Sequence, residues 1–342
     1  TPTAGIPMTD VIATSLADVK DAVESAIAAG HRLEVRGTGS KSNLGRECNA
    51  DAALDVSKMA GIVDYQPEEL VITLRAGTPM DEVEAALADA RQMLAFEPPR
   101  MGRISGGPRS ELQGTIGGIV AANLSGPRRL TAGATRDYLL GFEAISGRGE
   151  LFKSGGRVMK NVTGYDLVKL FAGSWGTLGI LTEVSFKVLP KPETEATIVI
   201  HGLNDQLALD AMIDATATPF DVSGLAHFPK QKETMIRVEG FENSVKYRVE
   251  RLMEIVKQYR EINTLDADKS MQVWRNISLL SSLKSNNDDL WRLSVKPTAS
   301  TQIVHKTKFN DYFYDWGGGL IWGLVSPNQD VREHVPAGYG HG

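Results

Sequence analysis

The chain has 342 residues, of which 42% are hydrophobic, so it can bury one large core or two ordinary ones and is not a disordered protein. Its formal net charge of −5, from 37 Lys and Arg against 42 Asp and Glu, argues against nucleic acid as a partner. The single cysteine, Cys48, excludes an internal disulfide and an iron–sulfur cluster held by this chain alone.

Cysteine usage and hydropathy also bear on the compartment. One cysteine in a chain of this length is typical of a reducing environment. No apolar run approaches the roughly 18 residues that a membrane-spanning helix needs, and residues 1–10 lack the basic and apolar parts of a signal peptide. We therefore expect a cytoplasmic protein whose contact with the inner membrane is at most peripheral and made through partners.

Helix and strand signals alternate from the start of the chain. Ser15, followed by Asp18 three residues later, predicts the start of a helix that Gly30 ends. The apolar face of this helix is predicted to carry Val19, Val23 and Ile27. The run 33–36 then predicts a strand.

The next elements continue this alternation. Residues 70–74 predict a strand, and Thr78-Pro79 predicts the start of a second helix. Val83, Ala86 and Leu87 form the apolar side of that helix. Strand and helix therefore alternate through this half of the chain.

A domain edge is predicted near Pro190 and Pro192, where the strand-like run 181–189 ends. We expect a first domain over 1–190 and a second over 191–342. In the second, periodicity predicts a helix over 243–259 and strands over 197–201, 222–227, 235–238 and 290–295. These elements predict an α+β domain with an antiparallel sheet.

The first glycine cluster is VRGTGSKSNLG, residues 35–45, directly after a predicted strand. Gly37 and Gly39 permit positive φ, so consecutive amides can turn inward and bind an anion such as phosphate. The string matches neither the GxGxxG dinucleotide fingerprint nor the GxxxxGK[ST] phosphate loop. Alone, it is equally compatible with an ordinary tight turn.

Two further clusters favour a cofactor. In residues 113–141, Gly114, Gly117 and Gly118 remove side chains from one face while neighbouring apolar residues supply packing. The string GSWGTLGILTEV, residues 173–184, places three more glycines before a predicted strand. One surface suited to phosphate and two suited to a flat apolar body predict a dinucleotide with a large ring, and a flavin fits. Plain packing between helix and strand is the alternative explanation for these glycines.

The order of these strings resembles a known family. RGTGSK, TIGGIVAANLSGPRR, AGATRDYLLG, GRVMKNVTGYDL and GSWGTLGILTEV resemble the FAD-binding domain of the vanillyl-alcohol oxidase type, in the branch of the E subunit of bacterial glycolate oxidase. The resemblance covers residues 16–190, and GRVMKNVTGYD, residues 156–166, is its most discriminating string. LWRLSVKPTA and DWGGGLIW, residues 290–299 and 315–322, resemble the second domain of that subunit. The resemblance implies an α+β protein: a two-lobed FAD-binding domain of the vanillyl-alcohol oxidase (PCMH) type, followed by a smaller α+β domain with an antiparallel sheet.

The resemblance also implies which residues bind FAD. Residues 36–41 would cradle the pyrophosphate, and the others would surround the dinucleotide and its ring. The full set is Arg36, Gly37, Thr38, Gly39, Ser40, Lys41, Pro98, Gly114, Thr115, Gly117, Gly118, Ala121, Asn123, Gly126, Arg136, Asp137, Gly179 and Ile180. Covalent flavoproteins of this class often carry a histidine where this chain has Ser40, so we expect non-covalent FAD.

The groups that would act on a substrate are less clearly marked. Relatives oxidise 2-hydroxy acids, which requires a base for the hydroxyl proton and a cation for the carboxylate. The six histidines form no HxxH or HxH pair, so the sequence predicts neither a metal site nor a paired base. We expect His227 and His305 to have ordinary structural roles. Arg292 is a weak candidate for the substrate carboxylate, with a surface or ion-pair role as the alternative. Lys160 and Asn161, in the discriminating string, are candidates for the flavin edge.

Three functions stay open. The favoured one is an FAD-bearing subunit of a glycolate (2-hydroxy acid) oxidase complex whose partners are a related flavin subunit and an iron–sulfur subunit. The alternatives are a self-sufficient FAD-dependent 2-hydroxy acid oxidoreductase and a cofactor-free scaffold subunit. Because one cysteine cannot hold a cluster that typically needs four thiolates, electrons have no exit within this chain. We expect partners to dock where tryptophans concentrate, on an apolar patch around Trp274, Trp291, Trp316 and Trp322.

Overall fold

A computed structural model describes residues 9–42, 44, 48–101, 114–156, 165–285, 287–338 and 340–341. The chain divides into two compact units. The first extends to Ser125 and continues with Ala134–Lys191, and the second comprises Gly126–Gly133 and everything from Pro192 onward. The sequence did not predict that the short segment Gly126–Gly133 packs with the second unit. Lys160 and Asn161 lie outside the described residues.

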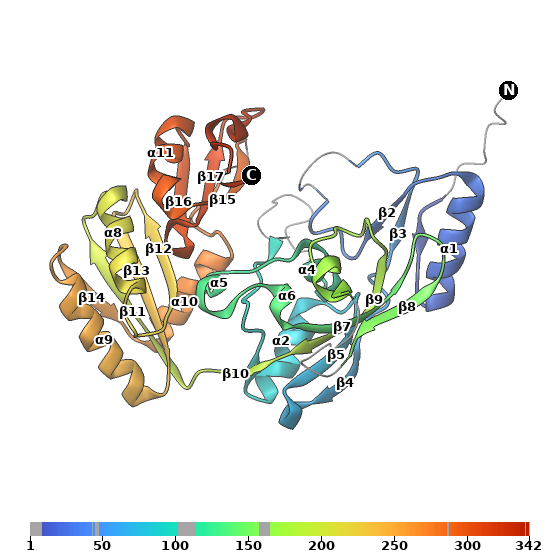
Figure 1. The fold of residues 1–342 in the computed structure, drawn as a ribbon, viewed down its shortest axis with the longest axis horizontal. Helices are drawn as coiled ribbons and strands as arrows, with labels where there is room; N and C mark the ends of the chain where they lie inside the picture. The colour runs from blue at the N-terminus through green and yellow to red at the C-terminus, as the bar shows by residue number, and fades with distance from the viewer. Residues whose placement is uncertain are drawn as a thin grey trace. The chain divides into compact units, whose positions relative to one another are not determined.

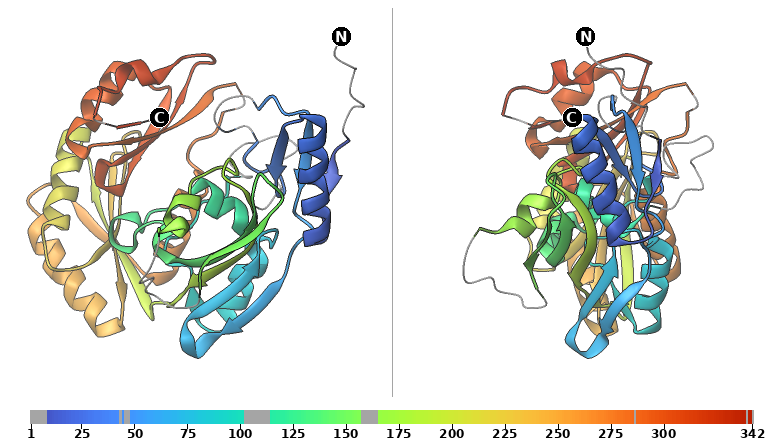
Figure 2. Two further views of the ribbon diagram at one scale, coloured as in Figure 1. Left: turned by 45° about the vertical axis from the view of Figure 1, so that its right-hand side comes forward. Right: turned by 90° about the vertical axis from the view of Figure 1, so that its right-hand side faces the viewer.

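One lobe of the first unit is a small parallel sheet covered by a helix. Strands β1 (Val11–Ile12), β3 (Ala52–Asp55) and β2 (Leu33–Arg36) pair in that order, and both ladders are parallel. Helix α1 (Leu16–Ala29) begins with the predicted capping box, in which the Ser15 hydroxyl accepts from Asp18 N, and it ends at Gly30 in a left-handed conformation. Figure 2 shows this helix in dark blue beside the small sheet.

The helix packs on the sheet through the predicted face, with one difference. Val19 and Val23 are buried with Leu54 in a common apolar cluster, as predicted. The prediction for Ile27 was wrong, because its side chain is 54% exposed. Ala22 and Ala26 are buried instead, so the buried stripe is rotated around the helix away from Ile27.

The other lobe is an antiparallel sheet of five strands in the order β4-β5-β9-β7-β8 (Figure 1). The strands are β4 (Ile62–Gln66), β5 (Val71–Arg75), β7 (Leu139–Ile145), β8 (Leu151–Gly155) and β9 (Ile180–Lys187). A short ladder pairs β6 (Gln92–Met93) with β10 (Leu189–Pro190). Helical segments of this unit are η1 (Pro67–Glu69), α2 (Met80–Asp89), α4 (Ile116–Ala122), α6 (Thr135–Tyr138) and α7 (Leu167–Phe171).

The second unit contains one antiparallel sheet of eight strands in the order β14-β11-β13-β12-β16-β17-β15-β18. The predicted strands 197–201, 222–227, 235–238 and 290–295 all lie within it. Its strands are β11 (Thr194–His201), β12 (Val222–Phe228), β13 (Glu233–Gly240), β14 (Ile262–Leu265), β15 (Asp289–Val295), β16 (Asp311–Asp315), β17 (Leu320–Val325) and β18 (Gly340–His341).

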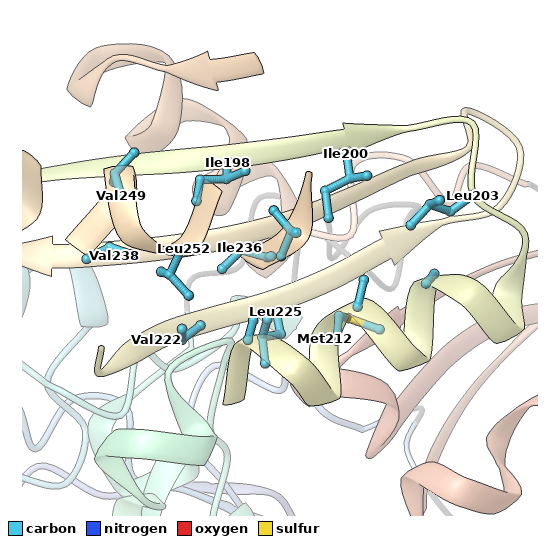
Figure 3. Close-up of a cluster of buried hydrophobic side chains, with 14 of the residues drawn as sticks. Ile198, Ile200, Leu203, Met212, Val222, Leu225, Ile236, Val238, Val249 and Leu252 are labelled. Carbon is cyan, nitrogen blue, oxygen red and sulfur yellow. The ribbon is translucent and has the colours of Figure 1, made fainter. Parts of the chain in front are cut away.

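Helices cover both faces of this sheet. The main core contains Ile198, Leu225 and Ile236 from the strands, packed on α8 and α9 (Figure 3). The alternate positions of these strands face the other way, where Trp274 of α10 donates its indole N–H to Thr197 Oγ1 at 2.8 Å. The helical segments are α5 (Arg129–Ala132), α8 (Asp205–Thr216), α9 (Glu242–Val256), α10 (Ala267–Ser278), α11 (Pro297–Thr307), η3 (Trp316–Gly318) and η4 (Val331–His334).

The prediction that tryptophans form an apolar surface patch was wrong. Trp274 is 1% exposed, Trp316 7% and Trp322 4%, so these three indoles belong to the interior of the second unit. The Trp274 indole donates its N–H to Thr197 Oγ1, and the Trp316 indole donates to Gly126 O. Because these hydrogen bonds satisfy the polar N–H, the indoles can be buried without an unpaired donor. No helix among the residues placed by the structure is long and apolar enough to cross a membrane.

Candidate cofactor site

The first unit contains a cavity of about 700 Å³, within the size range of small-molecule and cofactor sites. Three segments form its wall: the end of β2 with the turn that follows it, the first turns of α4, and the turn before β9. The predicted FAD-binding residues on this wall are Arg36, Gly37, Thr38, Gly39, Ser40, Lys41, Thr115, Gly117, Gly118, Ala121 and Gly179.

Other predicted residues lie off the wall. Gly114 accepts a backbone hydrogen bond from Met80 at 3.0 Å, and Asn123 ends α4 and accepts from Arg136 N at 3.1 Å. Arg136 and Asp137 lie on α6, Ile180 is 5% exposed within the apolar cluster beneath α1, and Pro98 is half-buried. Gly126 belongs to the second unit.

The sequence missed several wall residues. They are Leu33, Glu34, Val35, Ser42, Leu44, Cys48, Val56, Ala76, Ser174, Trp175, Gly176, Thr177 and Leu181. One signal was present, because Ser174–Thr177 lie inside the string GSWGTLG. Reading that whole string as wall, rather than only Gly179 and the neighbouring Ile180, would have found the turn.

The turn after β2 has positive φ at one of the two glycines for which the sequence predicted it, Gly39, but not at Gly37. Gly39 has φ of 74°, and Ser42 donates both its amide (3.2 Å) and its hydroxyl (2.8 Å) to the Gly39 carbonyl. Gly37 is required for a different reason: a Cβ there would lie 2.6 Å from Thr115 Oγ1. The turn is therefore held against the first residues of α4.

The glycines of α4 serve packing inside the protein. A Cβ on Gly117 would lie 2.7 Å from both the Cβ and the carbonyl oxygen of Ala76, so α4 packs directly on the backbone at the end of β5. A Cβ on Gly118 or Gly114 would instead lie 3.2 Å from Lys41 Nζ. The space that the sequence assigned to a flat ring beside these last two glycines is occupied by an ammonium group.

The turn before β9 is tied to the end of α4. Gly173 N donates to Val120 O at 3.0 Å, and Trp175 N donates to Ala121 O at 2.9 Å. Gly173, Trp175 and Gly176 all have positive φ, at 95°, 54° and 77°. Positive φ costs glycine nothing, but at Trp175 it is strained, so the surrounding structure must hold that residue in place, as is common at ligand sites. Trp175 is 51% exposed and is one of the residues that line the cavity.

The two cationic side chains on the wall, Arg36 and Lys41, differ in their ion-pair partners. Arg36 lies 3.3 Å from the Asp10 carboxylate and 4.0 Å from that of Glu34. Lys41 has the Ser40 hydroxyl at 3.3 Å, and no described carboxylate forms an ion pair with it. Burial lowers the pKa of the Lys41 ammonium to about 8. Within the described part of the wall, the Lys41 charge therefore has no ion-pair partner, which suits an anionic ligand.

Comparison with known proteins decides the family. A family model described as "FAD binding domain" matches residues 7–155. The chain is 38% identical to the glycolate oxidase subunit GlcE of Escherichia coli (strain K12) over 314 residues, which cover 91% of this chain and 81% of that protein. The chain belongs to the GlcE family. It is an FAD-binding member of a family of oxidoreductases, as the sequence predicted.

More distant relatives extend this comparison. The glycolate oxidase subunit GlcD of Bacillus subtilis (strain 168) is 37% identical over 56% of this chain and 37% of its own length. A D-lactate dehydrogenase of Anaerostipes hadrus is 34% identical over 45% of this chain and 31% of its own length. Among solved structures, an alkyldihydroxyacetonephosphate synthase superposes with a TM-score of 0.68 at 15% identity, covering 95% of this chain and 68% of that chain. This last likeness concerns the fold, and it confirms the expected fold class.

The second unit holds the weak substrate candidate, Arg292 of β15. Its guanidinium carbon lies 5.0 Å from the ring centre of Trp316 and 5.7 Å from that of Trp322. Arg129 of α5 lies over the same Trp316 ring at 5.8 Å. Burial lowers the pKa of Arg292, the Asp315 carboxylate opposes this shift, and Arg129 adds to it. Two cations therefore share one indole.

The histidines named in the sequence do not form a reactive pair. His227 is fully buried, with Nδ1 2.9 Å from Thr234 Oγ1 and Nε2 3.7 Å from Asp205 Oδ1. His305 lies exposed on α11. Within the described ranges, no group of three or more His, Cys, Asp or Glu side chains is arranged to hold a metal ion.

Proposed function

We propose that this chain is the FAD-bearing subunit of a complex that oxidises glycolate, or a close 2-hydroxy acid, to glyoxylate or the corresponding 2-oxo acid. The observation that carries the proposal is the similarity to a glycolate oxidase subunit along 91% of the chain. The cavity supports it, because its wall carries a glycine turn, the aromatic residue Trp175 and Lys41, which has no ion-pair partner among the residues that the structure describes. These groups suit the pyrophosphate and rings of a dinucleotide.

In this proposal the wall residues, together with the other residues that the resemblance implied, hold FAD without a covalent bond. The turn 36–41 faces the pyrophosphate, while the first turns of α4 and the turn before β9 lie along the rest of the cofactor. When bound, FAD supplies the acceptor for a hydride from the α-carbon of the substrate. The chain's own task is to orient that cofactor and to exclude water from it.

Arg292 is proposed to bind the substrate carboxylate. A guanidinium pairs with a carboxylate through two parallel hydrogen bonds, and the faces of Trp316 and Trp322 hold Arg292 in position. Arg129 supports this role, because a second cation on the same indole makes an anion between them more favourable.

The electrons taken from the substrate must pass to partner subunits. Oxidation of glycolate removes a hydride from carbon and a proton from the hydroxyl group, so two electrons must leave the flavin for each turnover. Cys48 alone cannot hold an iron–sulfur cluster. We propose that a related flavin subunit and an iron–sulfur subunit take these electrons, at a cytoplasmic location that touches the membrane only peripherally through these partners.

The purified chain is expected to bind FAD but to reduce an artificial dye with glycolate at a negligible rate, and to gain activity only when both partner subunits are added. The measurement is dye reduction per bound flavin, with the flavin content taken from its absorbance. Dye reduction by the single chain at the rate of the complex would contradict the proposal and favour a self-sufficient oxidoreductase. A colourless chain that binds no added FAD would favour the scaffold.

Arg292→Met is expected to raise the KM for glycolate of the assembled complex by about 10–100-fold, the loss of one hydrogen-bonded charge pair. The FAD content should stay unchanged. Arg251→Met is the matched control, because Arg251 lies over Tyr247 at 5.4 Å in the same unit but on an exposed helix face. Equal KM values for the two variants would show that Arg292 does not bind the substrate carboxylate.

A further inference from the structure

We propose that Asp315 restricts the substrate site of the second unit to acids with a single negative charge, by offsetting one of the two cations, Arg129 and Arg292, that bind the anion there. The proposal rests on the proposed function, because it takes Arg292 as the residue that binds the substrate carboxylate. It goes further in naming the substrate class, 2-hydroxy monocarboxylic acids, and the side chain that excludes dicarboxylic acids.

The sheet of the second unit places Asp315 on the same face as Arg292. Arg292 of β15 lies directly opposite Trp322 of β17, and Trp322 lies opposite Phe313 of β16. Paired residues of neighbouring strands share a face, and so do residues two apart along one strand. Asp315, two residues after Phe313, therefore faces the same side of the sheet as Arg292.

The residue next to Asp315, Trp316, brings the charged groups together. Its ring centre is 5.0 Å from the guanidinium carbon of Arg292 and 5.8 Å from that of Arg129. Its backbone N–H donates to Asp315 Oδ1 at 2.7 Å, and Asp315 is 2% exposed. Both cations and the carboxylate are therefore neighbours of a single residue.

The backbone at this indole has an unusual conformation. Trp316, Gly317 and Gly318 have φ of 53°, 59° and 90°. Glycine adopts such angles freely, but a tryptophan is strained there and must be held by its surroundings, as is common at functional sites. Asp315 holds the backbone N–H of Trp316, and the Gly126 carbonyl accepts from its indole N–H at 2.9 Å. The indole therefore has one defined position beside the carboxylate.

Arg129 is fixed over the same indole through its neighbours in the chain. Arg128 donates to the Glu239 carboxylate from Nε at 2.9 Å and from Nη2 at 2.6 Å. Arg129 N donates to the Gly126 carbonyl at 3.0 Å, the same carbonyl that accepts from the Trp316 indole. The backbone that carries Arg129 is therefore anchored on two sides.

The charged groups around the indole, two guanidinium groups and one carboxylate, have a net charge of one positive unit. Burial lowers the pKa of Arg292 and the Asp315 carboxylate opposes that shift, so Asp315 acts on the cation electrostatically. A bound monocarboxylate neutralises the cluster. A dicarboxylate would leave a negative charge near Asp315 in surroundings of low dielectric, where like charges repel strongly. Glycolate satisfies this condition, and a 2-hydroxy dicarboxylic acid does not.

The test is a ligand-detected NMR titration of the full, FAD-loaded chain at pH 7. Acetate and glycolate carry one charge, and malonate and hydroxymalonate are the same acids with a second carboxylate. The natural chain should bind acetate at least about tenfold more tightly than malonate, and glycolate at least about tenfold more tightly than hydroxymalonate. Glycolamide, which is neutral, should not compete with glycolate.

Variants assign this selectivity to Asp315. Asp315→Asn keeps an oxygen that can accept from Trp316 N but removes the charge, so it should strengthen malonate binding at least about tenfold more than acetate binding. Arg129→Met should weaken acetate binding by about 10–100-fold. Adding Asp315→Asn to Arg129→Met restores the net charge and should recover acetate binding. Asp330→Asn is the matched control, because Asp330 pairs with Arg332 at an exposed position of the same unit, and it should leave every Kd unchanged.

Three results would overturn the proposal: equal affinity of the natural chain for acetate and malonate, a selectivity that Asp315→Asn leaves unchanged, or acetate binding that Arg129→Met does not weaken. If Asp315→Asn does not fold, Arg129→Lys decides, since it keeps the charge and should keep the preference for acetate. Failure of the proposed function is distinguishable, because acetate and malonate have no hydroxyl group to oxidise. A chain that shows the charge selectivity with these two acids, in a complex that does not oxidise glycolate, would overturn the proposed function alone.

Discussion

Glu239→Gln should lower the free energy of unfolding by about 3–5 kcal/mol at pH 7, the cost typical of removing one partner from a buried ion pair. The Glu239 side chain is 6% exposed and accepts from Arg128 at 2.9 Å (Nε) and 2.6 Å (Nη2). Arg237 Nε lies 3.4 Å from the same carboxylate, and the Arg237 side chain is 1% exposed. A neutral amide leaves the buried Arg237 and the half-buried Arg128 without their shared anion.

The same variant has a defined pH signature. Burial by itself would raise the pKa of Glu239, but the charges of Arg237 and Arg128 outweigh it and lower the pKa to about 2. A carboxyl whose pKa is depressed by folding stabilises the protein above its unfolded pKa, and this stabilisation is lost as the pH falls through the folded pKa. The difference between natural chain and variant should therefore be full above pH 5 and shrink toward pH 2.

Urea unfolding at pH 7, 5 and 3 measures this difference. Glu254→Gln is the control, because Glu254 pairs with Arg251 at 3.3 Å on an exposed helix face, where such pairs contribute about 0.3–0.5 kcal/mol. If Glu239→Gln unfolds at the same urea concentration as the control, or if its deficit is undiminished at pH 3, the carboxylate does not hold this cluster.

Local signals in the sequence were enough for the elements but not for this cluster. The capping box at Ser15 and the strand 33–36 involve neighbours along the chain, so their chemistry is visible in a short window. Arg128 and Glu239 are 111 residues apart, and the Trp316 indole donates to a carbonyl 190 residues away. No short window of the sequence contains both partners of such a pair. For this reason the sequence did not predict that Gly126–Gly133 packs with the second unit.

The cofactor site shows the same division. The glycines of the RGTGS and TIGG strings indicated close packing, and at Gly37 and Gly117 the structure leaves no room for a Cβ. The missing side chain is visible in the residue type, but the group that occupies the space is not. Ala76 backbone lies against Gly117, and the Lys41 amine lies against Gly118, and both neighbours are set by the packing of β2, β5 and α4. The predicted tryptophan patch failed for this reason too, since an indole reveals no acceptor until the chain is folded.

Gly117→Ala and Gly118→Ala should both weaken FAD binding, but only Gly117→Ala should lower the free energy of unfolding, although the two residues are adjacent in α4. At Gly117 the new Cβ would lie 2.7 Å from the carbonyl oxygen and the Cβ of Ala76, and 3.1 Å from its Cα. Backbone cannot swing aside, and Gly117 N also donates to that carbonyl at 2.8 Å. Gly117→Ala should cost about 1–3 kcal/mol or more, as overpacking does, and should move α4 away from the cavity, with loss of FAD.

At Gly118 the new Cβ would lie 3.2 Å from the far end of a flexible side chain, Lys41 Nζ, and 3.3 Å from the Thr115 hydroxyl that caps α4. The amine can move, so the fold should tolerate the methyl group, and alanine is better than glycine within a helix by up to about 1 kcal/mol. Gly118→Ala should therefore unfold at the same or a higher urea concentration than the natural chain, yet bind FAD more weakly because Lys41 is displaced. Urea midpoints and flavin absorbance of both variants test this pair. Equal loss of stability at the two positions would mean that α4 is held by contacts other than its close approach to Ala76.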